Sequence, residues 1–243
     1  MAPSIASGRP VLPGWRRIPG PPRDPTKARL LRLYRALLGR YGPQGWWPAR
    51  TPFEVAVGAI LTQHTAWAGA ARAITALRAR RLLTPRRLAD VPVAALGVLV
   101  RPAGTYRLKA RRLLDFSRWL LERFGGDFRA LRRAPLDPLR RELLAVPGLG
   151  PETADAILCY AAGRRTPVVD AYARRVLGRH GLVAADAPYG SLRAWLLERL
   201  EPEQIVFEEF HALCVRAGYN HCKPAARCAT CPVPAPSPST QGP

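Results

Sequence analysis

Two carboxylates, Glu152 and Asp170, each stand at the expected start of a helix, where a carboxylate can do chemistry. Asp170 follows the apolar pair Val168-Val169, and Glu152 follows Pro151. The helix dipole favours a carboxylate in the first turn, and an aspartate there can accept a free backbone N–H. Capping explains both residues as well as catalysis does, so the residues alone leave both roles open.

Four cysteines toward the end of the chain have a spacing typical of a metal site. They form the pattern C-x7-C-x5-C-x2-C with Cys214, Cys222, Cys228 and Cys231. Closely spaced thiols indicate metal binding more often than coincidence, and sulfur-only ligation suits an iron–sulfur cluster or zinc. Zinc could also take His211 or His221, and a vestigial site without metal is a third alternative. We expect Cys159, which stands alone, to be a small buried apolar residue.

The turn PGLG joins two expected helices, 139–146 and 152–162, and offers backbone groups to a ligand. Gly148 and Gly150 allow a close approach of the backbone, and N–H groups at a helix start suit a phosphate. A simple packing corner between helices would use the same glycines. The chain has 38 Lys and Arg against 17 Asp and Glu, a net charge of +21, which favours the phosphate interpretation. Nucleic acid, more than an anionic membrane surface, is the expected partner.

The scaffold for these residues is predicted to be all-α, because strand signals are almost absent. Helical periodicity covers 28–41, 53–63, 67–81, 107–124, 139–146, 152–162, 171–181, 191–200 and 203–218. Short turns with Pro, Gly or Asp separate these helices. A leader, 1–26, and a tail, 233–243, are rich in Pro and polar residues and are expected to be disordered. Without a membrane-length apolar run or a secretory signal, the protein is expected to be cytoplasmic and associated with the nucleoid.

Three tryptophans and a proline between residues 46 and 67 predict an aromatic pocket. Trp46, Trp47 and Pro48 are consecutive, and Trp67 follows. Unstacking a flipped base costs a few kcal/mol, and stacking on aromatic side chains returns about 1–3 kcal/mol per base. The alternative is that these tryptophans anchor the N-terminal segment to the core.

The segment from Val146 to Val176 resembles the helix-hairpin-helix and Gly/Pro…Asp signature of the endonuclease III superfamily of DNA glycosylases. It contains the hairpin PGLG, an alanine-rich helix and Asp170 after an apolar pair. AILTQHT (59–65) and YRLKARRLL (106–114) resemble other helices of that superfamily, so the likeness spans roughly residues 28–232. The resemblance implies two all-α domains with a DNA cleft between them. These are a helical barrel, 51–164, with the hairpin, and a discontinuous Cys-bearing domain, 27–50 with 165–232.

The resemblance also assigns roles to the two carboxylates. Asp170 would be catalytic and would stabilise the oxocarbenium character that develops as an N-glycosidic bond breaks. Strand-nicking members carry a Schiff-base lysine eighteen residues before the aspartate, where this chain has Glu152. Because a carboxylate cannot be the amine nucleophile, a monofunctional glycosylase with absent or weak AP-lyase activity is expected. The residues expected to bind DNA are Gly148, Leu149, Gly150, Gln63 and Lys109.

Within the superfamily, the aromatic and hairpin segments most closely resemble 3-methyladenine DNA glycosylase III. That group stacks two tryptophans and a proline on one face of the damaged base and an aromatic residue on the other. The resemblance therefore assigns the base pocket to Trp46, Trp47, Pro48 and Trp67. Such a pocket favours cationic alkylated purines. Gln63 resembles the residue that fills the gap left by the flipped nucleotide, although plain helix-end polarity also explains it.

The cysteines resemble a different branch of the superfamily. Endonuclease III-like proteins often hold a [4Fe-4S] cluster at this place, with the spacing C-x6-C-x2-C-x5-C. Here the first gap has five residues and no cysteine follows Cys231, so Cys214 is expected to supply the fourth ligand. The 3-methyladenine group lacks the cluster, so the chain combines features of both groups.

Taken together, these observations predict a base-excision DNA glycosylase that acts as a monomer on duplex DNA containing a damaged base. An alkylated purine such as 3-methyladenine is the favoured substrate. One alternative is an endonuclease III-like glycosylase for oxidised pyrimidines with weak AP-lyase activity. Another is a lesion-binding protein with little or no turnover. A purely structural nucleoid protein would leave the tryptophans and Asp170 unexplained.

Overall fold

The structure, a computed structural model, describes residues 24–200 and 204–233. The elements in these ranges are all helices, and no strand occurs among them. The expectation of an all-α protein is therefore confirmed. Most of the expected leader and tail lie outside the described residues. Within those residues, no helix has the length and apolar character needed to cross a membrane.

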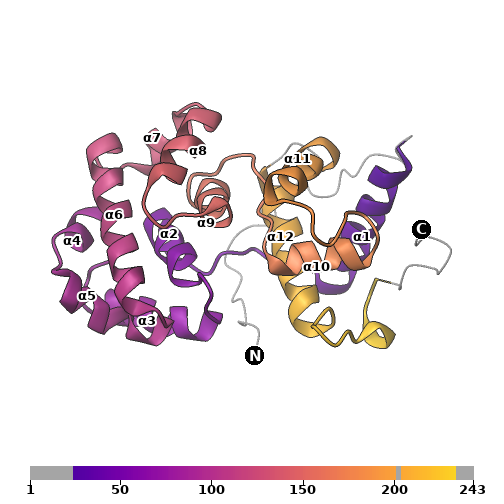
Figure 1. The fold of residues 1–243 in the computed structure, drawn as a ribbon, viewed down its shortest axis with the longest axis horizontal. Coiled ribbons are helices and arrows are strands. Elements are labelled where there is room, and N and C mark those ends of the chain that lie inside the picture. Colours follow the sequence, from indigo (N-terminus) through magenta and orange to yellow (C-terminus); the bar gives the residue numbers. More distant parts are fainter. Residues whose placement is uncertain (1–23, 201–203, 234–243) are drawn as a thin grey trace. The chain divides into compact units, whose positions relative to one another are not determined.

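The chain divides into two compact units, each of which is seen in Figure 1. The terminal unit contains Met1–Trp46 and Arg165–Pro243, and the central unit contains Trp47–Arg164. The sequence had suggested boundaries after residues 50 and 164. Both ends of the chain thus contribute to the terminal unit, and the central unit is a single continuous segment.

The central unit is built from helices that the chain forms one after another. They are α2 (Pro52–Leu61), α3 (Trp67–Ala79), α4 (Pro85–Ala89), α5 (Val93–Val100), α6 (Tyr106–Phe124), α7 (Phe128–Arg133), α8 (Leu136–Ala145) and α9 (Pro151–Ala156). A 3-10 turn, Arg101–Ala103, precedes α6, and a π-helical turn, Ile157–Ala161, continues α9. The short helices α4, α5 and α7 were not predicted from the sequence.

Helix α2 lies in the core of the central unit, and every residue from Phe53 to Leu61 is buried. Its start is fixed by Thr51, whose hydroxyl accepts from the backbone N–H of Glu54 at 3.1 Å. Glu54 is itself buried and forms an ion pair with Arg78 of α3. Pro52 occupies the first turn, where its missing N–H costs nothing.

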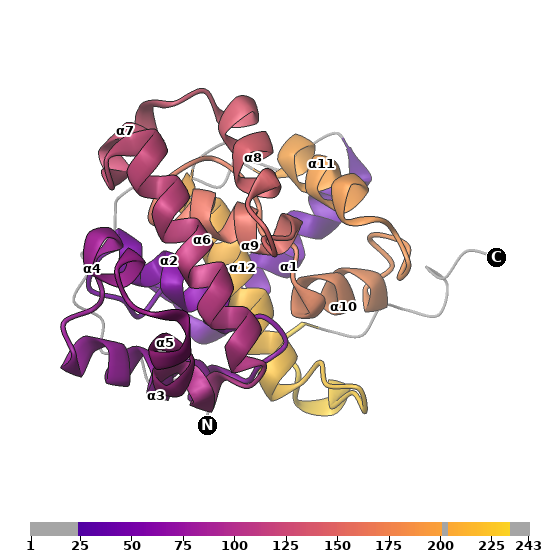
Figure 2. The same ribbon diagram turned by 60° about the vertical axis from the view of Figure 1, so that its left-hand side comes forward.

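Helix α6 is the longest helix of the central unit and runs beside α4 and α5 in Figures 1 and 2. Its buried residues recur every three or four positions, as expected for an amphipathic helix. Gly125 ends it in a left-handed conformation, with φ of 60°, and donates its N–H to the carbonyl of Leu121. The opposite face of α6 carries exposed arginines, including Arg111 and Arg118.

The terminal unit is assembled from segments far apart in the sequence. Its helices are α1 (Pro25–Tyr41), α10 (Ala171–Arg179), α11 (Tyr189–Arg199) and α12 (Gln204–Asn220), followed by a 3-10 turn, Cys228–Thr230. Helix α12 packs against both α1 and α10, and the rings of Tyr34 and Phe210 lie 6.2 Å apart. Glu209 of α12 accepts the N–H groups of Gln44 and Gly45 at 2.7 and 2.9 Å. Burial raises the pKa of Glu209.

Candidate functional site

The PGLG turn connects α8 and α9, and its two glycines differ in conformation. Gly148 has φ of +81°, which residues with a side chain rarely adopt. Gly150 has φ of −83°, and nothing lies within 4 Å of the place where a Cβ would stand. The side chain of Leu149 is buried and anchors the turn in the core. A contact of Leu149 with DNA would therefore involve its backbone, and the DNA-binding role of Leu149 stays a prediction.

A buried ion pair joins the two helices of the hairpin. Nε and Nη2 of Arg140, in α8, each donate to one carboxylate oxygen of Asp155, in α9, at 2.9 Å. The Asp155 side chain is fully buried, so this paired geometry satisfies a charge that would be costly alone. The pair fixes α8 against α9 and thereby fixes the shape of the turn between them.

Gln63 lies just beyond α2 and links it to the hairpin. Its Nε2 donates to the carbonyl of Gly148 at 3.1 Å and to Oγ1 of Thr153 at 2.8 Å. Its Oε1 accepts from Nη1 of Arg112, in α6, at 2.6 Å. Both ends of the amide are therefore engaged within the protein. Insertion of Gln63 into DNA stays a prediction, and it would require these bonds to be released.

Lys109 was expected to contact DNA, and its position contradicts that expectation. The side chain is fully buried, with 0% exposure. Its ammonium donates to the carbonyls of Leu61 and Ala103 and to Oγ1 of Thr65, at 2.5–2.9 Å. These acceptors use all three ammonium protons, so Lys109 ties the end of α2 to the turn before α6. Burial, with the nearby charge of Arg112, lowers the pKa of Lys109 to about 8.

Asp170, in the terminal unit, is the N-cap of α10. One carboxylate oxygen accepts from the backbone N–H of Ala173 at 2.7 Å, and the other lies 3.5 Å from Nε2 of His211, in α12. Only 13% of the Asp170 side chain is exposed. Burial raises the pKa of Cys214, also in α12, and the charge of Asp170 raises it further. Asp170 is thus a largely buried carboxylate, fixed by the N–H of Ala173 and flanked by His211, whereas Glu152 is exposed in the first turn of α9.

The expected aromatic residues are only partly brought together. Trp47 lies edge-on to Trp67, with ring centroids 5.7 Å apart, and edge-on to Tyr160 at 5.4 Å. Trp47 also covers Gly58 of α2, where a Cβ would come within 2.9 Å of its indole nitrogen. Pro48 is exposed beside this cluster, and Trp46 belongs to the terminal unit. Because the rings of Trp47 and Trp67 touch, a base could stack between them only after they separate.

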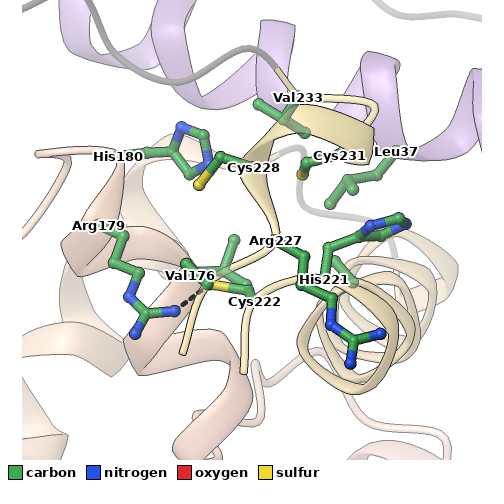
Figure 3. Close-up of a pocket in the computed structure, with 12 residues that line it drawn as sticks. Leu37, Val176, Arg179, His180, His221, Cys222, Arg227, Cys228, Cys231 and Val233 are labelled. Carbon is green, nitrogen blue, oxygen red and sulfur yellow. Dashed lines mark hydrogen bonds between the residues drawn. The ribbon is translucent and has the colours of Figure 1, made fainter. Parts of the chain in front are cut away.

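Three of the four expected metal-binding cysteines line one pocket of the terminal unit. Figure 3 shows the side chains of Cys222, Cys228 and Cys231 around this pocket, with Arg179 donating to the sulfur of Cys222 at 3.4 Å. Cys214 is fully buried in α12 and is not among the lining residues. In the part of the chain that is described, no three His, Cys, Asp or Glu side chains converge closely enough to hold a metal ion.

Helix α10 connects this cysteine loop to Asp170. Arg175 donates to the carbonyl of Cys222, and Arg179 donates to the carbonyls of Lys223 and Pro224. Both arginines lie on the helix that Asp170 caps. Of the two histidines considered as zinc ligands, His211 faces Asp170, and His221 lines the pocket with Nδ1 3.2 Å from Oγ1 of Thr230.

Sequence reasoning missed Arg112 and Tyr160, and it considered His211 only as a possible zinc ligand. Arg112 packs on the hairpin, Tyr160 packs against Trp47, and His211 lies beside Asp170. Helical spacing offers a signal for the first, since Arg112 follows the buried Lys109 by three positions on α6. The contacts of Tyr160 and His211 join segments distant in sequence, and no local pattern marks them.

A helix-hairpin-helix turn followed by an aspartate that caps a later helix is typical of a class of DNA-repair proteins. Comparison with known proteins identifies that class for this chain. Residues 57–202 match the HhH-GPD superfamily base excision DNA repair protein family. The putative DNA repair glycosylase MJ1434 of Methanocaldococcus jannaschii is 39% identical over 206 residues, covering 84% of this chain and 93% of that protein. Endonuclease III of Thermotoga maritima is 32% identical over 173 residues, covering 71% and 76%.

A solved structure of a DNA glycosylase is also similar to this chain. The H. pylori 3-methyladenine DNA glycosylase MagIII, bound to 1,N6-ethenoadenine, has a TM-score of 0.68 and 28% identity, covering 80% of this chain and 97% of that one. The chain therefore belongs to the HhH-GPD superfamily of base excision repair DNA glycosylases. The resemblance inferred from the hairpin and Asp170 is confirmed at this level.

Proposed function

We propose that the protein is a monofunctional DNA glycosylase that hydrolyses the N-glycosidic bond of a damaged base in duplex DNA. The observation that carries the proposal is the setting of Asp170. Its carboxylate is held by the start of α10 and by His211, with 13% of its side chain exposed. An anion in such a site stabilises positive charge on a deoxyribose more strongly than one in water, and it can orient or deprotonate the attacking water.

The lysines of the chain support hydrolysis without strand cleavage. Only Lys27, Lys109 and Lys223 are present, and Glu152 stands where strand-nicking relatives have their lysine. Lys109 is buried with its ammonium protons bound to three oxygens, so it is not available as a nucleophile. A Schiff base needs an accessible amine near the sugar, which favours water as the nucleophile instead.

The favoured substrate is an alkylated purine. Trp47, Trp67 and Tyr160 form an aromatic cluster in the central unit, and aromatic faces attract electron-poor, cationic bases. Similarity to a 3-methyladenine glycosylase supports this choice. Similarity to endonuclease III supports the second candidate, a glycosylase for oxidised pyrimidines with weak AP-lyase activity. We further propose that the protein acts on duplex DNA as a monomer, with Gly148 and Gly150 at the DNA backbone.

The test is release of free base from duplexes carrying alkylated or oxidised bases, comparing wild type with Asp170→Asn. Asparagine caps helices as well as aspartate does, so the variant should keep its fold and its DNA affinity. Single-turnover release of alkylated purine should fall by about 10²–10⁴-fold. Unchanged release would refute the role of Asp170. Binding without release by wild type would favour a lesion-binding protein, and borohydride trapping of a covalent adduct would favour the lyase alternative.

We also propose a [4Fe-4S] cluster as the cofactor, held by Cys214, Cys222, Cys228 and Cys231. Thiolates are the ligands that such clusters take, and three of the four thiols line one pocket, but the described cysteines would have to draw together to hold the cluster, with Cys214 reaching the pocket from α12. When bound, such a cluster supplies a structural cross-link rather than a reacting group. Alternatives are zinc and a vestigial site without metal.

Purified protein should be brown and contain iron and acid-labile sulfide, and Cys222→Ser should lose both. Cys159→Ser is the matched control, because Cys159 belongs to the central unit and does not line the pocket, and this variant should retain its iron. Colourless protein with stoichiometric zinc, or with no metal, would contradict the cluster.

A further inference from the structure

Arg112 of α6 lies directly on the hairpin turn. Its side chain passes so close to Gly148 that a Cβ there would come within 2.7 Å of Cγ and 2.8 Å of Cδ of Arg112. The glycine therefore does more than provide a left-handed φ, because it also leaves the space through which the arginine reaches the turn. The PGLG sequence contains no cation of its own, and Arg112 brings one to it from another helix.

The guanidinium of Arg112 is held in place but not neutralised. Nη1 donates to Oε1 of Gln63 at 2.6 Å, and Gln63 is fixed in turn by Gly148 and Thr153. Within residues 24–200 and 204–233, no carboxylate lies within ion-pair distance of Arg112, and its other N–H groups donate to no acceptor. Its charge acts on Lys109, whose pKa it helps to lower. Within the described ranges, the charge of Arg112 is thus not balanced by an ion pair.

Backbone donors of the same turn are free as well. Among the described residues, the N–H groups of Gly148 and Gly150 make no hydrogen bond, and both glycines are exposed. Free backbone donors beside a guanidinium without an ion pair suit an anion with several oxygens.

We propose that Arg112 binds a DNA phosphate at the hairpin, together with the N–H groups of Gly148 and Gly150. The inference rests on the proposed function, because it takes duplex DNA as the ligand. The hydrogen bond from Arg112 to Gln63 orders the guanidinium before DNA binds, so the Arg112 side chain loses little conformational entropy on binding. If Gln63 leaves the hairpin to enter the duplex, Arg112 gains free donors for the phosphate at the same moment.

The test is the salt dependence of binding to an undamaged duplex, which needs no base release. Each neutralised phosphate contributes about 0.9 to the slope of log K against log salt concentration. Arg112→Gln should lower this slope by about one and weaken binding, whereas Arg112→Lys should keep the slope. The control is Arg118→Gln. Arg118 is an exposed arginine on the same helix, so this substitution removes the same charge, but it should leave the slope unchanged.

Thermal unfolding of each variant checks that the fold is kept. A wild-type slope in Arg112→Gln, or an equal loss of slope in Arg118→Gln, would overturn the proposal. Failure of the proposed function has a different signature, because wild-type protein would then release no base while the slopes could still be measured.

Discussion

At the scale of single residues, Asp170 combines two tasks in one carboxylate. One oxygen satisfies a free N–H at the start of α10, and the other faces His211. Capping fixes the side chain's rotamer, so the second oxygen is oriented at little entropic cost. The catalytic and capping interpretations of the sequence are therefore not rivals, because the cap is what holds the carboxylate in a defined direction.

Lys109 offers a residue-scale prediction, because its charge is buried. Replacing it by Met leaves the carbonyl of Leu61 without its side-chain donor, at a cost of about 1–3 kcal/mol, whereas the carbonyl of Ala103 keeps the hydroxyl of Thr65. Lys109→Met should lower the free energy of unfolding near pH 7 without changing DNA affinity per folded molecule. Urea unfolding and duplex titration measure the two effects. A loss of DNA affinity with unchanged stability would contradict the structural role.

The pH dependence of the same variant follows from the pKa of Lys109, lowered to about 8 from an ordinary value of 10.5. Between these pH values the unfolded chain binds more protons than the folded one, so wild-type stability receives an increment that grows as the pH rises. Lys109→Met cannot titrate and should lack this increment. Urea unfolding from about pH 7.5 to 9.5 should show the difference, and parallel curves would exclude it.

At the scale of elements, the two glycines of the hairpin turn lead to different predictions, Gly148 for stability and Gly150 for DNA affinity. Gly148→Ala combines a left-handed φ with a clash against Arg112 and should destabilise the protein by about 1–3 kcal/mol. Gly150→Ala has an ordinary φ and open space, so stability should change by less than about 0.5 kcal/mol. Its DNA affinity should nevertheless fall, because the methyl group would stand where a phosphate approaches.

Thermal unfolding and anisotropy with a labelled duplex distinguish the two glycine variants. Full affinity in Gly150→Ala would argue that the turn does not touch the DNA backbone. A stable Gly148→Ala would show that α6 and the turn can adjust, contrary to the close packing of Arg112.

Sequence periodicity predicted long elements better than short ones. Helices α1, α6 and α12 carry many apolar repeats, and their predicted ranges differ from the observed ones by three residues or fewer at either end. Helix α4 has five residues, and its start depends on Thr84 accepting from the N–H of Arg87 rather than on any repeat. Contacts such as Lys109 with Ala103 arise from chain packing, so residue type alone suggested DNA binding where the structure shows burial.

At the scale of the whole molecule, the net charge of +21 sets how the protein meets DNA. Counterion release makes the affinity for undamaged duplex fall steeply with salt, by about 10³-fold or more between roughly 50 and 200 mM if six or more phosphates are contacted. Most of the arginines are on the surface and are screened by salt, whereas Asp170 is largely buried. DNA affinity and the rate of base release should therefore respond differently to the same change in salt concentration.

Equilibrium titrations across this salt range should give a steep linear loss of affinity for undamaged duplex. Single-turnover base release at saturating enzyme should change by less than about threefold, because salt screens the enclosed carboxylate only weakly. Keeping the enzyme above the dissociation constant at every salt concentration is the necessary control. If base release at saturating enzyme were as sensitive to salt as binding, the surface arginines would take part in bond cleavage. If the affinity did not change with salt concentration, the positive charge of the protein would not face the DNA.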